Sequence, residues 1–521
     1  MAALIVLPGN RVMSMNLLTA PGLWPLFERR VEKTPDALML IEGESGKRVT
    51  FSQAYDISER LAAGFFKRGI HANTVVTWQL PTGIQAVVTS LALARLGAIQ
   101  NPVIHLYGRQ EVRLVLERTR SAFLILESTD RSENNDFSAM LEGLEDPPDV
   151  IFMSDERPQA SKDCLPPVVM DDAPRWVYYT SGTTSEPKGA MHLDTSLLLG
   201  GRNLAAAIGV TGNDVGTIAF PIAHIGGAMY LAMVLASGMS VVLLRRFDPP
   251  EACAIFRRWG VTTTGGSTPH YQALLNQQGK QPDALIPSLR VVSGGGAPKP
   301  PQLYYDIKKV MNCALLHNFG MTEVPLIAAG SSNHTDEQLA NTDGLPVEGI
   351  EVRIVTAKGE LAEAGVAGEV RVRGAGTFKG YTDSELNETA FDEDGFFCTG
   401  DLGILRDDGH LVLTGRQKDL IIRKGENISA QEVENILVRH PKVAAAAVIG
   451  LPDNDRGERV CAVVELVSSD EPFTFEEMVA FFHREGVMKQ KIPEQLEIME
   501  ELPRSQALNK VAKSSLVPMF S

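Results

Sequence analysis

Short apolar runs alternate with longer amphipathic runs through the first two thirds of the chain. Residues 74–80 (TVVTWQL) and 122–127 (AFLILE) are short and apolar, as buried strands are. Between them, residues 83–98 (GIQAVVTSLALARLGA) have the pattern of an amphipathic helix that ends at a glycine. Strands that alternate with helices predict an α/β fold built on largely parallel sheets.

The pattern changes near residue 345. From there to residue 417, short alternating strands are interrupted by Gly and Asp, which predicts a β-rich module. Helical and strand patterns return in the last part, which has about 100 residues, a size typical of a separate domain. We therefore expect an N-terminal domain over residues 1–417 and a C-terminal domain over 418–521, joined through the short polar segment 415–420 (GRQKDL).

One long uncharged run, residues 226–244 (GGAMYLAMVLASGMSVVLL), approaches the length of a transmembrane helix. The sequence SGM interrupts this run, and SVVLL is typical of a strand. We therefore expect a buried helix, a turn and a buried strand here, and no integral membrane association.

The charge balance of the chain is acidic, and its apolar content is ordinary for a globular protein. The 521 residues include 49 Lys and Arg and 64 Asp and Glu, which gives a net charge of −15. This balance argues against nucleic acid as a partner, because neutralising phosphates requires clustered Lys and Arg. The five cysteines are scattered, and no basic segment precedes the apolar run at the start of the chain. We expect a cytoplasmic protein without a signal peptide, disulfide framework or zinc site.

The stretch 180–189 (TSGTTSEPKG) has the composition of a phosphate-binding loop. It follows a strand-like segment (RWVYY), and its hydroxyls, glycines and Lys188 can all approach phosphate oxygens. The Walker A spacing does not fit, because Pro187 stands where that motif needs its second glycine. A dinucleotide fingerprint fails as well, because Lys299 stands where its last glycine belongs. The loop therefore indicates a different nucleotide chemistry.

Together with five further segments, this loop resembles the motifs of the AMP-forming adenylating enzymes, which include acyl-CoA synthetases, peptide-synthetase adenylation domains and firefly luciferase. The segments follow the family's order and span nearly the whole chain. They are 317–323 (HNFGMTE), 368–381 (GEVRVRG…GY), 396–403 (FFCTGDLG), 415–434 (GRQKDLIIRKGENISAQEVE) and 502–513 (LPRSQALNKVAK). The resemblance implies a large N-terminal domain of two α/β subdomains plus the β-rich module, and a small, mobile α+β C-terminal domain that carries the catalytic lysine.

The resemblance implies a site for ATP, AMP and Mg²⁺. Glu323 would ligate the metal, since a carboxylate suits a hard cation, with Thr184 as a second ligand. Phe319, which stands where the family usually has tyrosine, would stack on adenine, and Asp401 would accept hydrogen bonds from both ribose hydroxyls. The implied nucleotide-binding residues are Thr180, Ser181, Gly182, Thr183, Thr184, Lys188, Gly295, Gly296, Ala297, Asn318, Phe319, Gly320, Met321, Thr322, Asp401 and Arg416.

The catalytic lysine and the domain movement are also implied by the resemblance. Lys510 would stabilise charge in the transition state, and Glu323 and His224 would be the other catalytic residues. The motif before Lys510 has one extra residue and Asn509 in place of a glycine, so Lys513 is the alternative. The small domain would swing about a hinge after adenylation and bring another face to the acyl-adenylate. The residues implied for the hinge and the CoA path are Lys418, Lys424, Gly425 and Glu426.

The segment 220–230 (FPIAHIGGAMY) bears on the acid that is activated. Family members that activate amino acids place an Asp directly after the Phe, whereas here Pro221 follows Phe220, so a buried ammonium would have no partner. We expect a hydrophobic acid, either fatty, alicyclic or aromatic. The residues implied for the acyl pocket are His224, Gly227 and Met321. A structural, hydrogen-bonded role for His224 is an equally supported interpretation.

Three functions fit these observations. The leading one is an acid–CoA ligase that uses ATP, Mg²⁺ and CoA, with a small carboxylic acid as its partner, and that belongs to fatty acid metabolism. The second is an acyl-AMP ligase that delivers its product to a carrier protein in trans. The third is a luciferase-like descendant. A homodimer is one option for its assembly.

Overall fold

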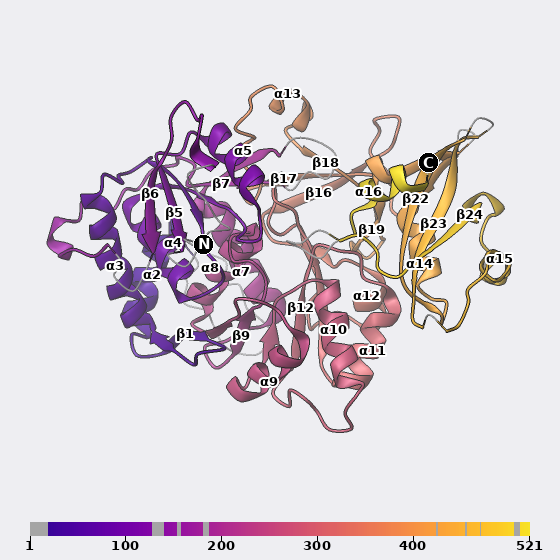
Figure 1. The fold of residues 1–521 in the computed structure, drawn as a ribbon, viewed down its shortest axis with the longest axis horizontal. Coiled ribbons are helices and arrows are strands. Elements are labelled where there is room, and N and C mark those ends of the chain that lie inside the picture. The colour runs from indigo at the N-terminus through magenta and orange to yellow at the C-terminus, as the bar shows by residue number, and fades with distance from the viewer. Residues whose placement is uncertain are drawn as a thin grey trace.

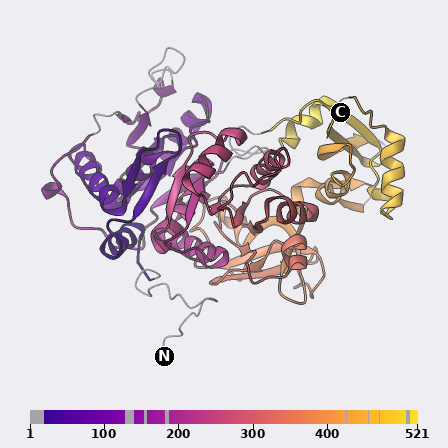
Figure 2. The ribbon, with the colours of Figure 1, turned by 90° about the horizontal axis from the view of Figure 1, so that it is seen from below.

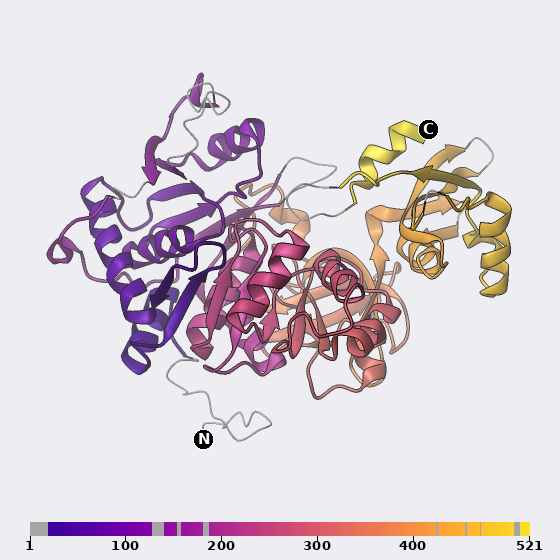
Figure 3. The ribbon, with the colours of Figure 1, turned by 60° about the horizontal axis from the view of Figure 1, so that its bottom comes forward.

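The computed structural model describes residues 19–127, 140–153, 158–180, 187–423, 426–453, 456–468, 470–504 and 511–520. Five sheets organise these residues. In Figure 1 the N-terminal half lies at one side, the C-terminal part lies at the opposite side, and strands β16 to β19, within residues 350–416, lie between them. Figures 2 and 3 show the same separation from two other directions. The α/β class predicted from the sequence is confirmed.

A six-stranded sheet near the N-terminus has the order β6-β5-β3-β4-β7-β8 and is parallel except for its last pair. Its last two strands flank the predicted phosphate loop. The strands are β3 Val75–Gln79, β4 Ile99–Pro102, β5 Phe123–Glu127, β6 Asp149–Met153, β7 Trp176–Tyr179 and β8 Gly189–His192.

Helix α4 (Ile84–Leu96) covers this sheet and ends at Gly97, whose positive φ of 66° suits glycine. The helix and its glycine end agree with the sequence prediction, but the predicted amphipathic character is wrong. Its polar residues Thr89 and Ser90 are buried together with the apolar ones. The reason is that α2 (Leu23–Lys33), α3 (Phe51–Lys67), β1 (Leu38–Glu42) and β4 pack around it, which leaves little solvent-facing surface for a polar stripe.

The uncharged run seen in the sequence forms helix α8 (Ile225–Ser237), a turn at Gly238 and strand β10 (Ser240–Leu243), as predicted. Strand β10 lies inside a four-stranded sheet of order β2-β1-β10-β9. No helix among the described residues is long and apolar enough to span a membrane. The other strands of this sheet are β1 Leu38–Glu42, β2 Arg48–Thr50 and β9 Val215–Ile218.

Helix α7 (Asp194–Ile208) packs closely on α8. A Cβ on Gly201 would come within 2.7 Å of the Met229 carbonyl oxygen, so this contact requires glycine. The other helices up to residue 417 are α5 Arg109–Thr119, α9 Pro249–Trp259, α10 Thr268–Gln278, α11 Pro301–Met311, α12 Asp336–Asn341 and α13 Asn387–Ala390, with a 3-10 turn at Lys162–Cys164.

A third sheet, of order β11-β12-β13-β14-β15, begins with three parallel strands. Strands β12 and β13 end at the same edge, so the glycine turn after β12 and the turn after β13 lie side by side, and ligands of α/β folds bind at such edges. The strands are β11 Thr263–Thr264, β12 Val291–Gly295, β13 Ala314–Phe319, β14 Ala328–Ala329 and β15 Leu345–Pro346.

The β-rich module predicted after residue 345 is present as an antiparallel sheet of order β16-β17-β18-β19. Its apolar side chains form a core with Phe319, Val324 and Ile327, which joins the module to the end of β13. The strands are β16 Ile350–Val355, β17 Gly368–Gly374, β18 Phe397–Leu405 and β19 Leu411–Arg416, and a 3-10 turn follows at Gln417–Asp419.

The C-terminal part has one sheet with apolar residues on both faces, because successive side chains of a strand point to opposite sides. In β22, Val448 belongs to one core and Ile449 to the other; in β23, Ala462 and Cys461 divide in the same way. These two cores contain only residues after 420. The elements are β20 Leu420–Arg423, β21 Glu426–Ser429, α14 Ala430–Leu437, β22 Val443–Asp453, β23 Gly457–Leu466, α15 Phe475–Arg484, a 3-10 turn at Lys489–Lys491, β24 Gln495–Met499 and α16 Lys513–Phe520.

Candidate active site

A cleft of about 2590 Å³ lies between the N-terminal part and one face of the C-terminal part. The carboxyl ends of β7, β12 and β13 open into it from the N-terminal side. Helix α14 and the first residue of α16, Lys513, line it from the C-terminal side. The cleft is therefore bounded by both predicted domains.

Most residues predicted from the sequence line this cleft. They are Thr180, Lys188, His224, Gly295, Gly296, Ala297, Asn318, Phe319, Gly320, Met321, Thr322, Glu323, Asp401, Arg416 and Lys418.

Two predicted residues lie away from the lining. Gly227 packs against backbone, since a Cβ there would come within 2.1 Å of the Ile222 carbonyl oxygen, and Glu426 lies at the start of β21. The other predicted residues fall outside the described part of the chain: Ser181, Gly182, Thr183, Thr184, Lys424, Gly425 and Lys510.

Glu323 is held from two directions in the turn that follows β13. Its carbonyl oxygen accepts the Phe378 N–H at 2.8 Å, and its carboxylate Oε1 accepts the Tyr381 hydroxyl at 2.7 Å. The turn itself is closed by Met321 and Val324, whose N–H groups donate to each other's carbonyl oxygens at 2.9 and 3.1 Å. Both the backbone and the side chain of Glu323 are thus fixed.

The surroundings of Glu323 fit a divalent cation beside phosphates. The residue is 6% exposed, and burial raises the pKa of its carboxyl, whereas the Tyr381 hydrogen bond and the charges of Lys188 and Arg416 lower it. One buried carboxylate beside cations that can face phosphate oxygens is the protein contribution typical of a Mg²⁺–nucleotide site. When bound there, Mg²⁺ would neutralise phosphate charge.

Asp401 and Arg416 lie opposite each other on β18 and β19, and Arg416 Nε lies 2.7 Å from Asp401 Oδ1. Asp401 is 4% exposed, whereas the Arg416 side chain is 46% exposed. An ion pair with one solvated partner contributes little to stability. Because Asp401 and Arg416 both line the cleft, their side chains are available to a sugar or a phosphate.

Two backbone segments form one wall of the cleft. Gly295 lies opposite Asn318 in the β12–β13 ladder, and a Cβ on Gly295 would come within 1.9 Å of the Asn318 carbonyl oxygen. This approach requires glycine and leaves a flat wall of main chain. Phe319 follows on the same strand, is 6% exposed, and packs partly into the core of the β-rich module.

His224 caps a helix at the apolar end of the cleft. Its Nδ1 accepts the Gly226 N–H at 3.1 Å at the start of α8. In the neutral ring the proton is therefore on Nε2, which makes the ring a hydrogen-bond donor at that atom. Phe220, Ile225 and Met229 line the cleft beside it. His224 thus makes a structural hydrogen bond, as one of its two interpretations from the sequence requires.

Two contacts at the site involve residues that the sequence analysis did not assign. His192, the last residue of β8, is fully buried, and its Nε2 donates to the Thr322 carbonyl oxygen at 2.7 Å. Burial lowers the pKa of His192 to about 4, so the ring is neutral at pH 7. Tyr381 holds Glu323 as described above. Tyr381 ends the quoted motif 368–381, which was the available signal, whereas His192 lies three residues after the quoted loop and no quoted motif includes it.

A cluster of charged and titratable residues lies beside the nucleotide wall. His317 Nε2 is 3.5 Å from Asp343 Oδ1, and Lys299 Nζ donates to the Ala340 carbonyl oxygen. Burial raises the pKa of Asp343 to about 6 and lowers the pKa of Lys299 to about 8. These residues line the same cleft and add charge near Asp401.

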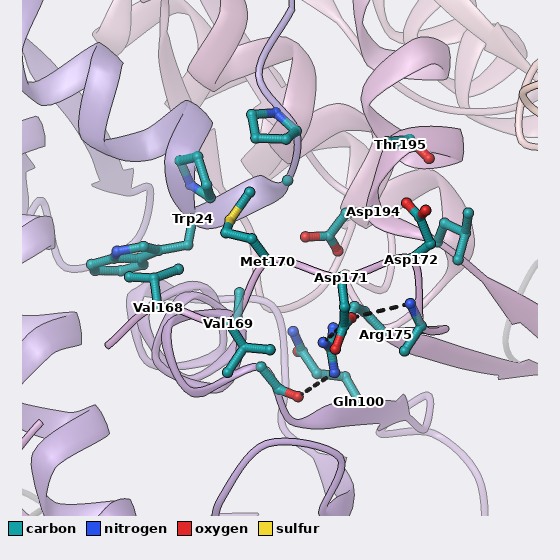
Figure 4. A pocket seen from close by; sticks show the side chains of 17 residues that line it. Trp24, Gln100, Val168, Val169, Met170, Asp171, Asp172, Arg175, Asp194 and Thr195 are labelled. Carbon is teal, nitrogen blue, oxygen red and sulfur yellow. Dashed lines mark hydrogen bonds and ion pairs between the residues drawn. The ribbon is translucent and has the colours of Figure 1, made fainter. Parts of the chain in front are cut away.

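A second, small cavity lies beside Trp24 and Asp194 in the N-terminal part (Figure 4). Its volume of about 40 Å³ is close to that of one water molecule. The Asp194 carboxylate at this cavity already accepts the Leu23 N–H at 2.8 Å and the Trp176 indole N–H at 2.7 Å. This cavity is too small for a nucleotide, so the large cleft is the candidate site.

Two family models match the chain. The model described as "AMP-binding enzyme" matches residues 27–382, and the model described as "AMP-binding enzyme C-terminal domain" matches residues 432–507. The chain belongs to the AMP-forming adenylating enzyme superfamily. It is therefore an enzyme, an AMP-forming acid–thiol ligase, as the motifs predict.

Relatives across the whole chain agree with this membership. A medium-chain fatty-acid–CoA ligase of Escherichia coli is 30% identical over 93% of this chain and 89% of its own length. A salicyl-AMP ligase / salicyl-S-ArCP synthetase of Mycobacterium tuberculosis is 31% identical over 98% and 93%. The o-succinylbenzoate coenzyme A synthetase of Bacillus subtilis, solved with ATP and magnesium ion, has a TM-score of 0.80 and 28% identity over 94% and 98%. The predicted use of ATP, Mg²⁺ and CoA is supported by these relatives.

The arrangement can bring two anions together, which adenylation requires. Lys188 and Arg416 supply positive charge near Glu323, and all three residues line the same cleft. Asp401 can orient a ribose through its hydroxyls. Holding a carboxylate and an α-phosphate in one orientation lowers the entropy cost of their reaction, and fixed charges stabilise the transition state.

Proposed function

We propose that this protein is an ATP-dependent acid–CoA ligase that activates a hydrophobic carboxylic acid, either fatty, alicyclic or aromatic. In the first half-reaction the carboxylate oxygen attacks the α-phosphorus of ATP, and pyrophosphate leaves. In the second half-reaction the sulfur of CoA attacks the acyl carbonyl, AMP leaves, and the thiol proton passes to solvent. The product is an acyl-CoA thioester.

The observation that carries the proposal is the character of the cleft wall around His224. Among the described lining residues between Ala219 and Asn276, none is acidic. An α-ammonium group would therefore lie there without a counter-charge, which is costly. The apolar residues that form this wall are Ala219, Phe220, Pro221, Ala223, Ile225 and Met229.

We assign roles to the site residues as part of this proposal. Glu323, with Thr184, would hold Mg²⁺. Asp401 and Arg416 would hold the ribose and an adjacent phosphate, and Lys510 would stabilise the transition state. The supporting observations are the fixed side chain of Glu323 and the ion pair between Asp401 and Arg416 at 2.7 Å.

A second candidate acceptor is a carrier protein that carries a phosphopantetheine thiol. The relative of 31% identity whose name includes salicyl-S-ArCP synthetase supports it. The adenylation half-reaction is common to both candidates, so only the acceptor distinguishes them.

The test is a panel of fatty, alicyclic, aromatic and steroid-side-chain acids, with amino acids as the matched negative set. ATP–pyrophosphate exchange measures adenylation, and AMP release with CoA or with a phosphopantetheinylated carrier protein identifies the acceptor. We expect exchange with apolar acids and AMP release that depends on CoA. Exchange with amino acids alone would contradict the acid class. Release with the carrier protein but not with CoA would favour the second candidate.

Three further features belong to the same proposal. We infer a domain boundary at 417/418, which limited proteolysis can test, because cleavage should fall near the polar segment 415–420. We infer a cytoplasmic protein from the scattered cysteines, which cell fractionation can test. A homodimer is one option for the assembly, and light scattering on the purified chain measures the oligomeric state.

A further inference from the structure

Tyr381 lies where three parts of the site meet. Its backbone forms a bridge with Ala190 on β8, and the neighbouring Thr382 N–H donates to the Gly189 carbonyl oxygen at 2.8 Å. On the other side of Ala190, the Met191 N–H donates to the Gly380 carbonyl oxygen at 2.9 Å. The segment after β17 is therefore joined by main-chain hydrogen bonds to the strand that leaves the phosphate loop.

The side chain of Tyr381 contacts two charged residues that line the cleft, Glu323 and Lys188. Its hydroxyl donates to Glu323 Oε1 at 2.7 Å, and Lys188 Nζ lies 5.3 Å from its ring centroid. The ring also packs edge-on against Phe378, with centroids 4.8 Å apart, and the residue is only 5% exposed. The hydroxyl is thus held in place by packing rather than by solvent.

We propose that Tyr381 is a positioning residue that orients Glu323 for Mg²⁺·ATP and aligns Lys188 beside the same phosphates. This inference rests on the proposed function, because it assigns no new reaction and refines how the metal carboxylate is held. Tyr381 does not itself touch the reacting atoms in this account. It acts through Glu323.

The physical argument starts from the two oxygens of the Glu323 carboxylate. A hydrogen bond from a neutral phenol to an ionised carboxylate is short and strong, and burial at 5–6% exposure makes it stronger. The hydroxyl takes one acceptor position at Oε1 and holds the carboxylate in one orientation, and its remaining lone pairs can bind a metal. Hydrogen bonds of this kind to a metal-binding group fix its orientation and commonly change metal affinity by about 10- to 100-fold when removed.

The cation above the ring gives Tyr381 its second role. A Lys ammonium within about 6 Å of an aromatic face is attracted by the ring. Lys188 is thereby drawn toward the part of the cleft where Glu323 lies, with its ammonium over the face of the ring and the Glu323 carboxylate at the hydroxyl. Tyr381→Phe removes the hydroxyl while it keeps the ring, so the two roles can be separated.

The test is equilibrium binding measured by isothermal titration calorimetry on the full chain, without an acid, so that no turnover occurs. Mg²⁺·ATP and metal-free AMP are the two probes. We expect Tyr381→Phe to weaken Mg²⁺·ATP binding by about 10- to 100-fold and to leave AMP binding unchanged. A merely structural role would weaken both ligands together.

Tyr304→Phe is the matched control, because the Tyr304 hydroxyl also donates to a carboxylate at 2.7 Å, that of Asp336, and neither residue lines the cleft. It should change neither binding constant. A double-mutant cycle with Glu323→Gln supplies the second measurement. If Tyr381 acts through Glu323, adding Tyr381→Phe to Glu323→Gln should have little further effect on Mg²⁺·ATP binding.

The outcomes separate this inference from the proposed function. Absence of Mg²⁺·ATP binding in the wild-type protein would contradict the proposed function itself. Normal wild-type binding together with unchanged Mg²⁺·ATP affinity in Tyr381→Phe would overturn the inference alone. Additive effects of the two substitutions, or equal weakening of ATP and AMP, would also overturn it.

Discussion

Lys513 Nζ lies 2.6 Å from Glu434 Oε1, which joins the first residue of α16 to helix α14. The same oxygen accepts the Val448 N–H of β22 at 2.7 Å. The Glu434 side chain is 12% exposed and that of Lys513 is 26% exposed. The pair therefore stabilises the C-terminal part, and the Lys513 ammonium is engaged in an ion pair with Glu434.

This pair distinguishes the two lysines considered for catalysis. We expect Lys510→Ala to lower the rate of ATP–pyrophosphate exchange by about 10²- to 10³-fold, because it removes a charge aimed at the transition state. Lys513→Met should leave exchange near the wild-type rate and lower the free energy of unfolding by about 2 kcal/mol, because Glu434 loses its partner. Exchange assays and urea denaturation measure the two effects. Lost exchange in Lys513→Met at wild-type stability would reverse the assignment.

The buried His192 predicts a pH dependence of stability. Its pKa is lowered from the usual histidine value of 6.5 to about 4, because burial disfavours the charged ring. Below pH 6.5 the unfolded chain takes up a proton that the folded protein does not. Stability therefore falls as the pH falls from 6.5 to 4, by roughly 3 kcal/mol in total.

His192→Gln is the matched variant for this prediction, because a Gln amide can still donate to the Thr322 carbonyl oxygen but does not titrate. Urea denaturation of both proteins between pH 4.5 and 7.5 isolates the contribution, since the other histidines are common to them. We expect the stability advantage of the wild type to shrink on acidification. A constant difference across this range would refute the account of His192.

The sequence patterns predicted the elements better than the contacts between them. The uncharged run became α8, a turn and β10, and the motif glycines lie where backbones approach, as Gly295 does opposite Asn318. These features depend on local periodicity and on the absence of a Cβ, both of which are visible in one chain.

The contacts that complete the site could not be predicted in this way. Tyr381 and Glu323 are 58 positions apart, and His192 and Thr322 are 130 apart. Helix α4 shows the same limit, because its polar residues are buried by neighbours from several parts of the chain. Periodicity describes one element and its faces, whereas these facts depend on which elements pack together.

Substitution of Asp401 should weaken nucleotide binding without a matching loss of protein stability. Asp401→Asn should weaken AMP binding by about 10- to 100-fold, because hydrogen bonds to a charged acceptor are the stronger ones. Arg416→Gln should weaken AMP binding less and barely change the melting temperature, because the Arg416 side chain is 46% exposed. Calorimetric titration with AMP and thermal melting test both statements. Unchanged AMP affinity in Asp401→Asn would remove the ribose assignment.

Neighbouring glycines at the start of α8 test where the acid binds. Gly226 lines the cleft, and a Cβ there would meet His224 Nδ1 at 3.2 Å, whereas a Cβ on Gly227 would come within 2.1 Å of the Ile222 carbonyl oxygen. Gly226→Ala should lower kcat/KM for bulky acids more than for small ones. Gly227→Ala should cost about 1–3 kcal/mol of stability and leave the preference among acids unchanged.

Steady-state kinetics with a short and a bulky acid, together with urea denaturation, measure both effects. The two substitutions add the same methyl group one residue apart, so each is the control for the other. The prediction assumes that the acid lies against the face of α8 that carries Gly226, and not against the face that carries Gly227. A changed acid preference in Gly227→Ala, with an unchanged preference in Gly226→Ala, would place the acyl group on the other side of this turn.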